Sequence, residues 1–401
     1  MWTGQVLSML EMLVRRGRLE VVFPDGTART FGPGRDGPDV AVRLTDAARL
    51  RHLLTDPEMA LGEAYMDGTL TIERGDLHGF LTLLVLNGGR TNLPPLVRAG
   101  FGLRRALRPL AQANARAAAR RNVTRHYDLG DDFYDLFLDA DRQYSCAYFP
   151  RPGLTLEEAQ QAKKDHIAAK LLIEPGMRVL DIGCGWGGMA LTLARDHGAR
   201  VVGVTLSDNQ AATARARAEA AGLSDRIDIR LTDYRDLHER FDRIVSVGML
   251  EHVGAPNFGA YFRKVDGLLG PDGVALIHTI GRCAPPTTTS SWLAKYIFPG
   301  GYTPSLSELA RAIETTALWQ ADIEVWRGHY AETLRRWRAR FEAQLDAVRR
   351  MHDERFVRMW RYYLVAAEVG FDTHRHAVYQ LQLAKTRTAV PATRDYLCHA
   401  G

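Results

Sequence analysis

The chain has 401 residues, of which 46% are hydrophobic and 25% are charged. These proportions are typical of a globular protein of two or three domains, and they exclude a disordered or collagen-like chain. The four cysteines are far apart and form no Cys-x-x-Cys pair, so we predict neither a disulfide framework nor a metal site, and a reducing cytoplasm fits best.

The sequence does not predict a membrane span or a secretory signal. No apolar run approaches the ~20 residues that a helix needs to cross a bilayer. In the N-terminal segment the basic residues Arg15, Arg16 and Arg18 follow the apolar run, whereas a secretory signal has its basic residues first. Any contact with a membrane is therefore expected at its surface.

Residues 1–86 are predicted to form an N-terminal α+β domain. Apolar residues on one helical face predict a helix over residues 2–13. A Pro-Asp-Gly turn at Pro24 between two β-rich runs predicts a hairpin over residues 18–31. A further strand and two helices are expected at residues 40–44, 46–54 and 79–86.

Residues 87–125 are predicted to be a linker with an unusual charge. The formal net charge of the chain is +5, yet this segment alone contains nine arginines and no acid: Arg90, Arg98, Arg104, Arg105, Arg108, Arg116, Arg120, Arg121 and Arg125. Leucines interleave the arginines, which is the composition of a segment that contacts anionic lipid. A solvated linker fits equally well, and no recognition motif supports nucleic acid.

Residues 126–401 are predicted to form an α/β catalytic domain. Helices expected at 155–172, 188–197, 208–221 and 257–269 alternate with strands expected at 178–182, 200–204, 227–231, 241–247 and 274–277. This alternation predicts a doubly wound, mostly parallel sheet of the Rossmann-like type. The remainder should be mostly helical, with a closing strand at 378–383.

The strongest motif is the glycine-rich loop that follows the first strand of this domain. Gly183, Gly185, Gly187 and Gly188 do not have the spacing of the dinucleotide fingerprint, and Asp181 precedes the loop. The pattern resembles motif I of the class I S-adenosylmethionine-dependent methyltransferases. In that class the acid anchors the amino-acid part of the cofactor through the loop.

Two further strand ends carry polar residues. The second strand ends at Thr205, where many methyltransferases have an acid for the ribose, so Ser207 and Gln210 are the candidate replacements. After the third strand, Asp233 and Tyr234 are candidates for contact with adenine, and an exposed turn is an equally good interpretation of that pair.

A series of ordered motifs then resembles one family. The segments 125–130, 144–148, 180–187, 203–210, 246–254 and 278–281 are similar to those of the cyclopropane-fatty-acyl-phospholipid synthases and the related mycolic acid methyltransferases. Residues 62–68 resemble the extra N-terminal domain of the bacterial phospholipid synthases, which the mycolic enzymes lack. The likeness covers residues 120–390 most strongly.

The resemblance implies both a cofactor and a reaction. It implies that S-adenosylmethionine is bound by Tyr144, Ser145, Asp181, Gly183, Cys184, Gly185, Trp186, Gly187, Thr205, Leu206, Ser207, Gln210, Asp233 and Tyr234. It implies a base, a bicarbonate ion, held by Cys146, Glu251, His278, Ile280 and Tyr330. A raised pKa is expected for Glu251, because a carboxylate beside an anion must share a proton or orient a donor.

The expected reaction is cyclopropane formation on the double bond of an unsaturated acyl chain in a membrane phospholipid. A methyl-branched or methylene product, and small-molecule N-methylation, are the alternatives. Residues 283–350 are expected to form an acyl-binding lid, in which Trp292, Tyr296, Phe298 and Tyr302 either line the acyl channel or simply pack. We expect a cytoplasmic, peripheral protein on the inner face of the membrane, and the resemblance implies a homodimer.

Overall fold

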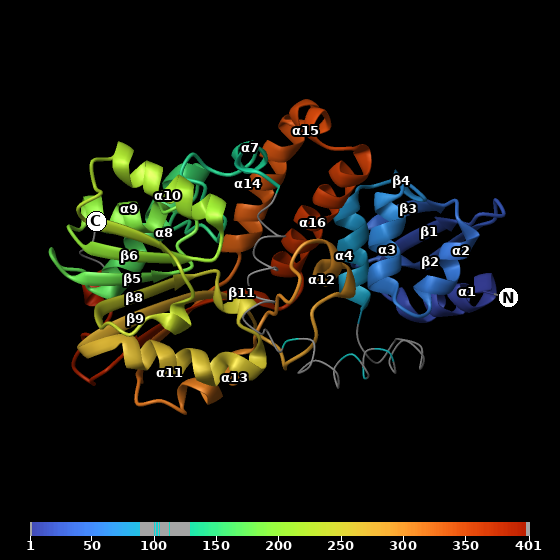
Figure 1. Ribbon diagram of the computed structural model, residues 1–401. Helices are drawn as coiled ribbons and strands as arrows, with labels where there is room; N and C mark the ends of the chain where they lie inside the picture. The colour runs from blue at the N-terminus through green and yellow to red at the C-terminus, as the bar shows by residue number, and fades with distance from the viewer. Residues whose placement is uncertain are drawn as a thin grey trace. The chain divides into compact units, whose positions relative to one another are not determined.

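The computed structural model describes residues 2–88, 100, 102, 104, 112 and 129–397 (Figure 1). Most of the predicted basic linker of residues 87–125, and Cys398, lie outside the described residues. Within the part of the chain that the structure describes, no helix has both the length and the apolar character needed to cross a bilayer.

The chain divides into two compact units, and neither is continuous in sequence. Unit 1 comprises Met1–Leu110, Thr287–Pro299 and Leu334–His376, and unit 2 comprises Ala111–Pro286, Gly300–Thr333 and Ala377–Gly401. Two segments of the predicted catalytic domain therefore pack with the N-terminal residues. The linear division at residues 86 and 126 did not anticipate this exchange, because it depends on contacts between distant segments.

Unit 1 is built on a four-stranded sheet in the order β2-β1-β3-β4. Its strands are β1 (Gly17–Val22), β2 (Ala28–Arg35), β3 (Asp39–Leu44) and β4 (Leu70–Arg74). β1 and β2 are antiparallel, and the N–H of Phe23 donates to the carbonyl of Thr27 at 2.8 Å. The predicted hairpin is confirmed.

Helices from three parts of the sequence complete unit 1. They are α1 (Trp2–Leu13), α2 (Ala47–Leu53), α3 (Pro57–Met66), α4 (Leu77–Asn87), α12 (Ser291–Tyr296), α15 (Leu345–Met351) and α16 (Glu354–Asp372). α16 packs on α3 and α4, and α12 packs on α3. Gly62 of α3 makes room for α12, since a Cβ there would lie 2.3 Å from the Trp292 ring.

Unit 2 is built on a seven-stranded sheet in the order β10-β11-β9-β8-β5-β6-β7. Its strands are β5 (Arg178–Ile182), β6 (Arg200–Thr205), β7 (Ile227–Leu231), β8 (Phe241–Val247), β9 (Leu269–Arg282), β10 (Trp319–Trp326) and β11 (His376–Ala384). The pairs β5–β6, β5–β8, β6–β7 and β8–β9 are parallel. The predicted mostly parallel α/β sheet is confirmed.

Helices cover both faces of this sheet (Figure 1). α8 (Leu156–Leu171), α9 (Gly188–Asp196) and α10 (Asp208–Ala220) lie on one face, and α11 (Phe258–Leu268) and α13 (Leu306–Ile313) lie on the other. The shorter helices are α7 (Asp131–Asp135), η2 (Tyr234–Asp236), η3 (Leu250–His252), η4 (Ala255–Asn257) and η5 (Asp395–Leu397). α14 (His329–Ala343) begins in unit 2 and continues into unit 1.

The sequence analysis missed α3, β4 and β10. β10 is an edge strand whose first three residues are exposed, so it lacks the apolar run that marked the buried strands. Because β5, β6, β8 and β9 run in the same direction, their carboxyl ends lie at one edge of the sheet, where ligands bind in open α/β folds.

Candidate active site

The glycine-rich loop leaves β5 at Ile182 and is shaped by glycine conformations. Gly183, Gly185 and Gly187 have φ values of +81°, +54° and +82°, which other residues rarely adopt. The N–H of Gly183 donates to the carbonyl of Val204 at 2.9 Å, which ties the loop to β6. A Cβ on Gly185 would have nothing within 4 Å, so the loop backbone is open to a ligand there.

Cys184, another predicted cofactor residue, packs inside the loop. A Cβ on Gly203 of β6 would lie 3.0 Å from the Cys184 sulfur, so Gly203 makes room for this side chain. Burial raises the pKa of the Cys184 thiol well above its ordinary value. Cys184 can therefore meet a ligand only through its backbone.

Asp181 lies at the end of β5 beneath this loop. It is 2% exposed, and its Oδ2 atom has no hydrogen-bond partner. Burial raises the pKa of Asp181 to about 7, although the nearby Lys163 ammonium opposes the shift. A buried carboxylate oxygen without a partner is costly unless a ligand supplies a donor. The residues therefore fit a cofactor that carries an ammonium group.

The segment before α8 contributes Tyr144 and Ser145. The Ser145 hydroxyl accepts a hydrogen bond from Nζ of Lys163 at 2.8 Å, and the side-chain amide of Gln160 donates to the Ser145 carbonyl at 3.0 Å. The Tyr144 ring lies 5.4 Å from that of Tyr134. These contacts hold the segment against α8 in one conformation.

Trp186 of the loop packs its buried side chain against α7. Its Nε1 donates to Oδ1 of Asp131 at 2.9 Å, and its ring lies 5.2 Å from Tyr134. Asp131 also accepts from Asn209 at 2.6 Å and from Thr213 at 3.0 Å, and these contacts keep its pKa below the ordinary value despite the opposing effect of burial. Asp131 thus links the loop to α10.

At the end of β6 the predicted polar residues bond to one another. The Thr205 hydroxyl donates to the Gln210 side-chain oxygen at 2.9 Å, and the Ser207 hydroxyl accepts from the N–H of Gln210 as the N-cap of α10. Leu206 between them is half-buried. These side chains stabilise the turn, which is adjacent to the glycine loop through the Gly183–Val204 bond.

After β7 the pair Asp233 and Tyr234 forms a short helical turn. Asp233 accepts from the Arg235 guanidinium at 2.8 Å and caps η2. The Tyr234 ring lies 5.5 Å from Tyr261, and burial raises the pKa of Tyr234 to about 12. The turn interpretation accounts for the local contacts of this pair, and contact with adenine stays a prediction.

A second buried carboxylate, Glu251, follows β8. Its Oε1 accepts the N–H of Ile280 at 2.6 Å, while Oε2 is buried without a hydrogen-bond partner. Burial raises the pKa of Glu251 to about 7, and the Ile280 N–H partly opposes that shift. Glu251 and Ile280 are therefore in direct contact, whereas the sequence analysis expected each of them to hold a bicarbonate ion, which stays a prediction.

His278 lies on β9, beside the end of β8. Its carbonyl accepts the N–H of Gly248 at 2.9 Å. The side-chain amide of Gln380 lies 3.2 Å from Nδ1 of His278, so the two side chains are hydrogen-bonded and Nδ1 is occupied. Burial lowers the pKa of His278 well below its ordinary value, which keeps the imidazole neutral.

Cys146 and Tyr330 belong to two segments that bond to each other. The N–H of Ala147 donates to the Thr333 hydroxyl at 3.0 Å, and the N–H of Phe149 donates to Nδ1 of His329 at 3.1 Å. Tyr330 follows His329 in the first turn of α14 and is 8% exposed. Burial raises the pKa of the Cys146 thiol, so it is not a thiolate.

No hydrogen bond between described residues joins Cys146 directly to Glu251 or His278. The structure thus joins Glu251 to Ile280, and Cys146 to the helix that carries Tyr330. Sequence analysis missed Lys163, Asp131 and Arg217, which hold these segments in place. The available signal for Lys163 was its helical spacing from Leu156 and Ile167, which puts it on the buried face of α8.

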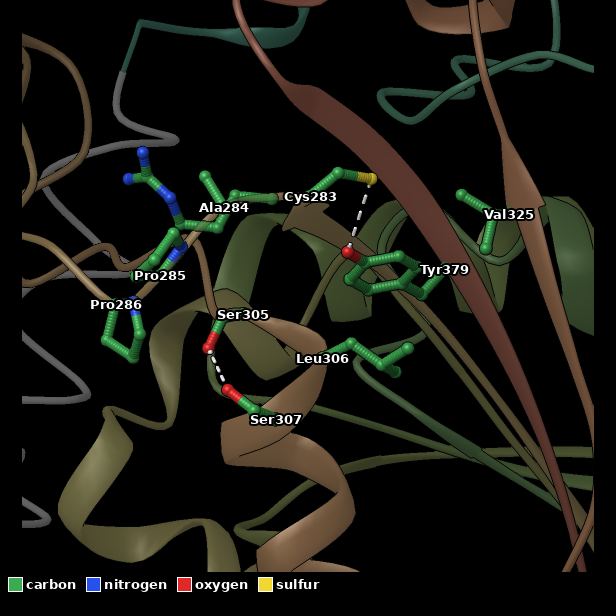
Figure 2. Close-up of a pocket in the computed structure, with 10 residues that line it drawn as sticks. Cys283, Ala284, Pro285, Pro286, Ser305, Leu306, Ser307, Val325 and Tyr379 are labelled. Atoms are coloured by element: carbon green, nitrogen blue, oxygen red, sulfur yellow. Dashed lines mark hydrogen bonds between the residues drawn. The ribbon is translucent and has the colours of Figure 1, made fainter.

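A cavity of about 440 Å³ opens at the carboxyl end of β9 (Figure 2). Its lining residues are mostly apolar: Arg282, Cys283, Ala284, Pro285, Pro286, Ser305, Leu306, Ser307, Val325 and Tyr379. The Cys283 sulfur lies 3.6 Å from the Tyr379 hydroxyl. The cavity begins two residues beyond Ile280 and lies within unit 2.

The aromatic run of the predicted lid is divided between the units. Trp292 is 2% exposed and packs on Gly62 and, at 4.7 Å, on the Tyr362 ring in unit 1. Tyr302 belongs to unit 2, and its N–H donates to the Glu251 carbonyl at 2.9 Å. Packing within unit 1 accounts for the burial of Trp292, whereas the backbone of Tyr302 is hydrogen-bonded to that of Glu251.

Comparison with known proteins decides the family. The family described as mycolic acid cyclopropane synthetase matches residues 114–381. The chain belongs to this family. It is an S-adenosylmethionine-dependent methyltransferase, as the glycine-rich loop predicted. A separate family, described only as a domain of unknown function, matches residues 8–89.

Individual relatives support the assignment. The chain is 39% identical to the cyclopropane-fatty-acyl-phospholipid synthase of Escherichia coli (strain K12), with 86% of this chain and 87% of that protein covered. It is 37% identical to a tuberculostearic acid methyltransferase of Mycobacterium tuberculosis, with 92% and 88% covered. A crystal structure of a mycolic acid cyclopropane synthase complexed with SAH and CTAB matches with a TM-score of 0.63 and 34% identity, and covers 66% of this chain and 98% of that chain.

Proposed function

We propose that this methyltransferase converts the double bond of an unsaturated acyl chain in a membrane phospholipid into a cyclopropane ring. The observation that carries the proposal is the buried Glu251, which accepts the N–H of Ile280 with one carboxylate oxygen and has no partner for the other. Such a group suits proton removal next to a bound methyl donor. The identity to the E. coli phospholipid synthase over most of both chains supports the substrate class.

The chemistry needs a strong electrophile and a proton acceptor. S-adenosylmethionine, when bound, supplies an electrophilic methyl group, and a bicarbonate ion, when bound, supplies the acceptor for the proton. We assign the first to the loop of Gly183, Gly185 and Gly187 with Asp181. We assign the second to Cys146, Glu251, His278, Ile280 and Tyr330.

The residues of the proposed proton site have complementary states. Glu251 has a pKa of about 7, so it can present a proton to an anion and share it. Neutral His278 offers its Nε2 atom, because Gln380 occupies Nδ1. The surrounding side chains are buried, which excludes water from the cation that forms when an alkene is methylated.

We further propose that the cavity beyond Ile280 receives part of the acyl chain. Its apolar lining includes residues 283–286 and 305–307 of the predicted lid, and it begins near the proposed proton site. Filling it with Leu306→Trp should lower turnover of lipid while binding of S-adenosylhomocysteine is retained. Unchanged turnover of a folded variant would remove the cavity from the acyl path.

We keep a methyl-branched or methylene product as the alternative, because one relative is by name a tuberculostearic acid methyltransferase. The alternatives differ in mass and unsaturation, so lipids from cells that express the protein distinguish them. A gain of one CH2 group that resists hydrogenation means a ring. The same gain with uptake of hydrogen means a methylene group, and a further gain of two hydrogens means a methyl branch. Lipids of unchanged mass would contradict the proposal.

We also propose that the protein works at the surface of the cytoplasmic membrane, on anionic lipid, and as a homodimer. The arginine-rich composition of residues 87–125 supports the first two statements. The family resemblance supports the third. Vesicle co-sedimentation and light scattering test them separately from the chemistry.

A further inference from the structure

Lys163 is a buried cation that the proposed chemistry does not use. It lies in α8 and is 0% exposed. Its Nζ donates to the Gln143 side-chain oxygen at 2.6 Å and to the Ser145 hydroxyl at 2.8 Å. Among the residues that the structure describes, no carboxylate lies within 4.0 Å of this nitrogen. A buried ammonium without a counterion is costly, so its charge calls for an explanation.

The neighbouring lysines show the usual arrangement. Nζ of Lys164 pairs with Asp141 at 2.6 Å, and the equally buried Lys170 pairs with Glu324. Both lysines are on α8, so this helix carries three buried lysines. Only two of them pair with a carboxylate from another segment.

The acids nearest to Lys163 balance its charge only in part. Asp141 is occupied by Lys164 and Arg217. Asp139 accepts the N–H of Gln143 at 2.9 Å, and burial raises its pKa. Burial also raises the pKa of Asp181 to about 7, which shifts it toward the neutral form. Burial accordingly lowers the pKa of Lys163 to about 8, and the charges of Asp139 and Asp141 only partly oppose this shift.

The two groups that Lys163 holds both adjoin the proposed cofactor loop. Ser145 lies next to Tyr144 in the segment expected to bind the cofactor. Gln143 packs on the first residue of α9, since a Cβ on Gly188 would lie 2.3 Å from its Nε2. Lys163 thus joins α8, the segment 143–145 and the helix that follows the glycines.

We propose that Lys163 is a positioning residue of the cofactor site, whose ammonium offsets the carboxylate of the cofactor's amino-acid part through Ser145 and Gln143. The inference rests on the proposed assignment of the loop to S-adenosylmethionine. Asp181, whose Oδ2 atom has no hydrogen-bond partner, is close enough for the Lys163 charge to act on its pKa, and it suits the ammonium of the same amino-acid part. Lys163 and Asp181 together match its two opposite charges.

Two ligands isolate this role by calorimetry. S-adenosylhomocysteine carries the amino-acid part, whereas 5′-methylthioadenosine lacks it and keeps the nucleoside. Lys163→Met should weaken the binding of S-adenosylhomocysteine by roughly 10- to 100-fold, because a charged hydrogen-bonding partner is lost. Binding of 5′-methylthioadenosine should be unchanged. In turnover, KM for S-adenosylmethionine should rise far more than kcat falls.

Matched variants separate charge from packing. Lys170→Met removes an equally buried lysine. In this variant the affinity for S-adenosylhomocysteine divided by that for 5′-methylthioadenosine should equal the value of the parent protein. Lys163→Arg keeps the charge and should restore most of the ratio. If Lys163→Met does not fold, Lys163→Gln repeats the measurement.

Equal losses for both ligands, or no loss for either, would overturn the role of Lys163. A loss in Lys163→Arg as large as that in Lys163→Met would overturn the role of its charge. Failure of the parent protein to bind S-adenosylhomocysteine is a different result, because it would refute the assignment of the loop itself.

Discussion

Two strand ends in unit 2 carry carboxylates in similar burial but with different neighbours. Asp181 ends β5 and Glu251 follows β8, and each has one buried oxygen without a hydrogen-bond partner. Burial raises the pKa of both to about 7. The Lys163 ammonium opposes the shift at Asp181, whereas the neutral N–H of Ile280 opposes it at Glu251. The Lys163 cation favours the ionised form of Asp181, which suits binding of a charged ligand. The neutral N–H of Ile280 leaves Glu251 able to hold a proton and to share it.

The largest expected effect is at the loop above Asp181. Gly185→Val should abolish binding of S-adenosylhomocysteine, because a side chain would occupy the open side of a backbone that has φ +54°. Gly222→Val is the control, since Gly222 also has a positive φ and open space but lies outside the loop. Both variants should lose about 1–2 kcal/mol of stability, and only the first should lose binding in calorimetry.

The next effect is at the strand end near Glu251. His278→Ala should lower turnover by ~10²-fold or more, because it removes a positioned donor from the proton site. Binding of S-adenosylhomocysteine should survive. Gln380→Leu should lower turnover less, since it frees Nδ1 of His278 without removing the ring. Near-normal turnover in His278→Ala would move the proton site elsewhere.

The pH dependence of stability distinguishes the two carboxylates further. The pKa of each carboxyl group is higher in the folded than in the unfolded protein. The contribution of each group to the free energy of unfolding is therefore fully present below about pH 4 and is lost as pH rises toward about 7. Glu251→Gln should therefore gain stability relative to the parent between pH 5 and pH 8, by on the order of 2–3 kcal/mol. Asp181→Asn should show the same trend in denaturant unfolding.

The ligand then separates the two trends. Saturating S-adenosylhomocysteine should remove most of the pH dependence due to Asp181, because its ammonium would stabilise the ionised carboxylate. The dependence due to Glu251 should remain. Equal responses of both to the ligand would contradict the division between the two strand ends.

The smallest effect concerns the basic segment. Changing Arg104, Arg105 and Arg108 to Gln should weaken binding to anionic vesicles roughly thirtyfold at low salt, because two effective cations contribute about 1 kcal/mol each before screening. Arg105 and Arg108 lie outside the described residues. Arg104 pairs with Glu58 at 3.3 Å, so Arg104→Gln alone should have little effect on binding. Co-sedimentation across a salt series measures both, and unchanged binding of the triple variant would make the segment a simple linker.

Much of unit 2 could be predicted because its signals are local. β5 begins and ends at the predicted residues, since a buried parallel strand is a short apolar run that a glycine loop ends. The loop itself was predicted from its glycines and the acid before them, and the structure gives Gly183, Gly185 and Gly187 the positive φ values that favour glycine. Glu251 and Ile280 were expected to hold one bicarbonate ion from family resemblance, and the structure places them in contact at 2.6 Å, while the ion itself stays a prediction.

Other features depend on distant contacts and could not be predicted. The packing of α16 on α3 and α4 places residues 354–372 with the N-terminal unit, and no local pattern indicates that partner. β10 was missed because an edge strand needs few apolar residues. Lys163 was missed because a lysine in a helix usually faces solvent. Only its buried position, which the structure gives, distinguishes it from a surface lysine.

The most direct test compares Asp181→Asn with Glu251→Gln in one preparation, by measuring both S-adenosylhomocysteine affinity and turnover at saturating S-adenosylmethionine. The two substitutions are matched, since each removes a charge from a buried carboxylate of similar pKa. We predict that Asp181→Asn weakens the affinity by at least tenfold, and that Glu251→Gln keeps the affinity but loses ~10²-fold or more in turnover. If both variants lose affinity and turnover in the same proportion, the two strand ends do not have separate tasks.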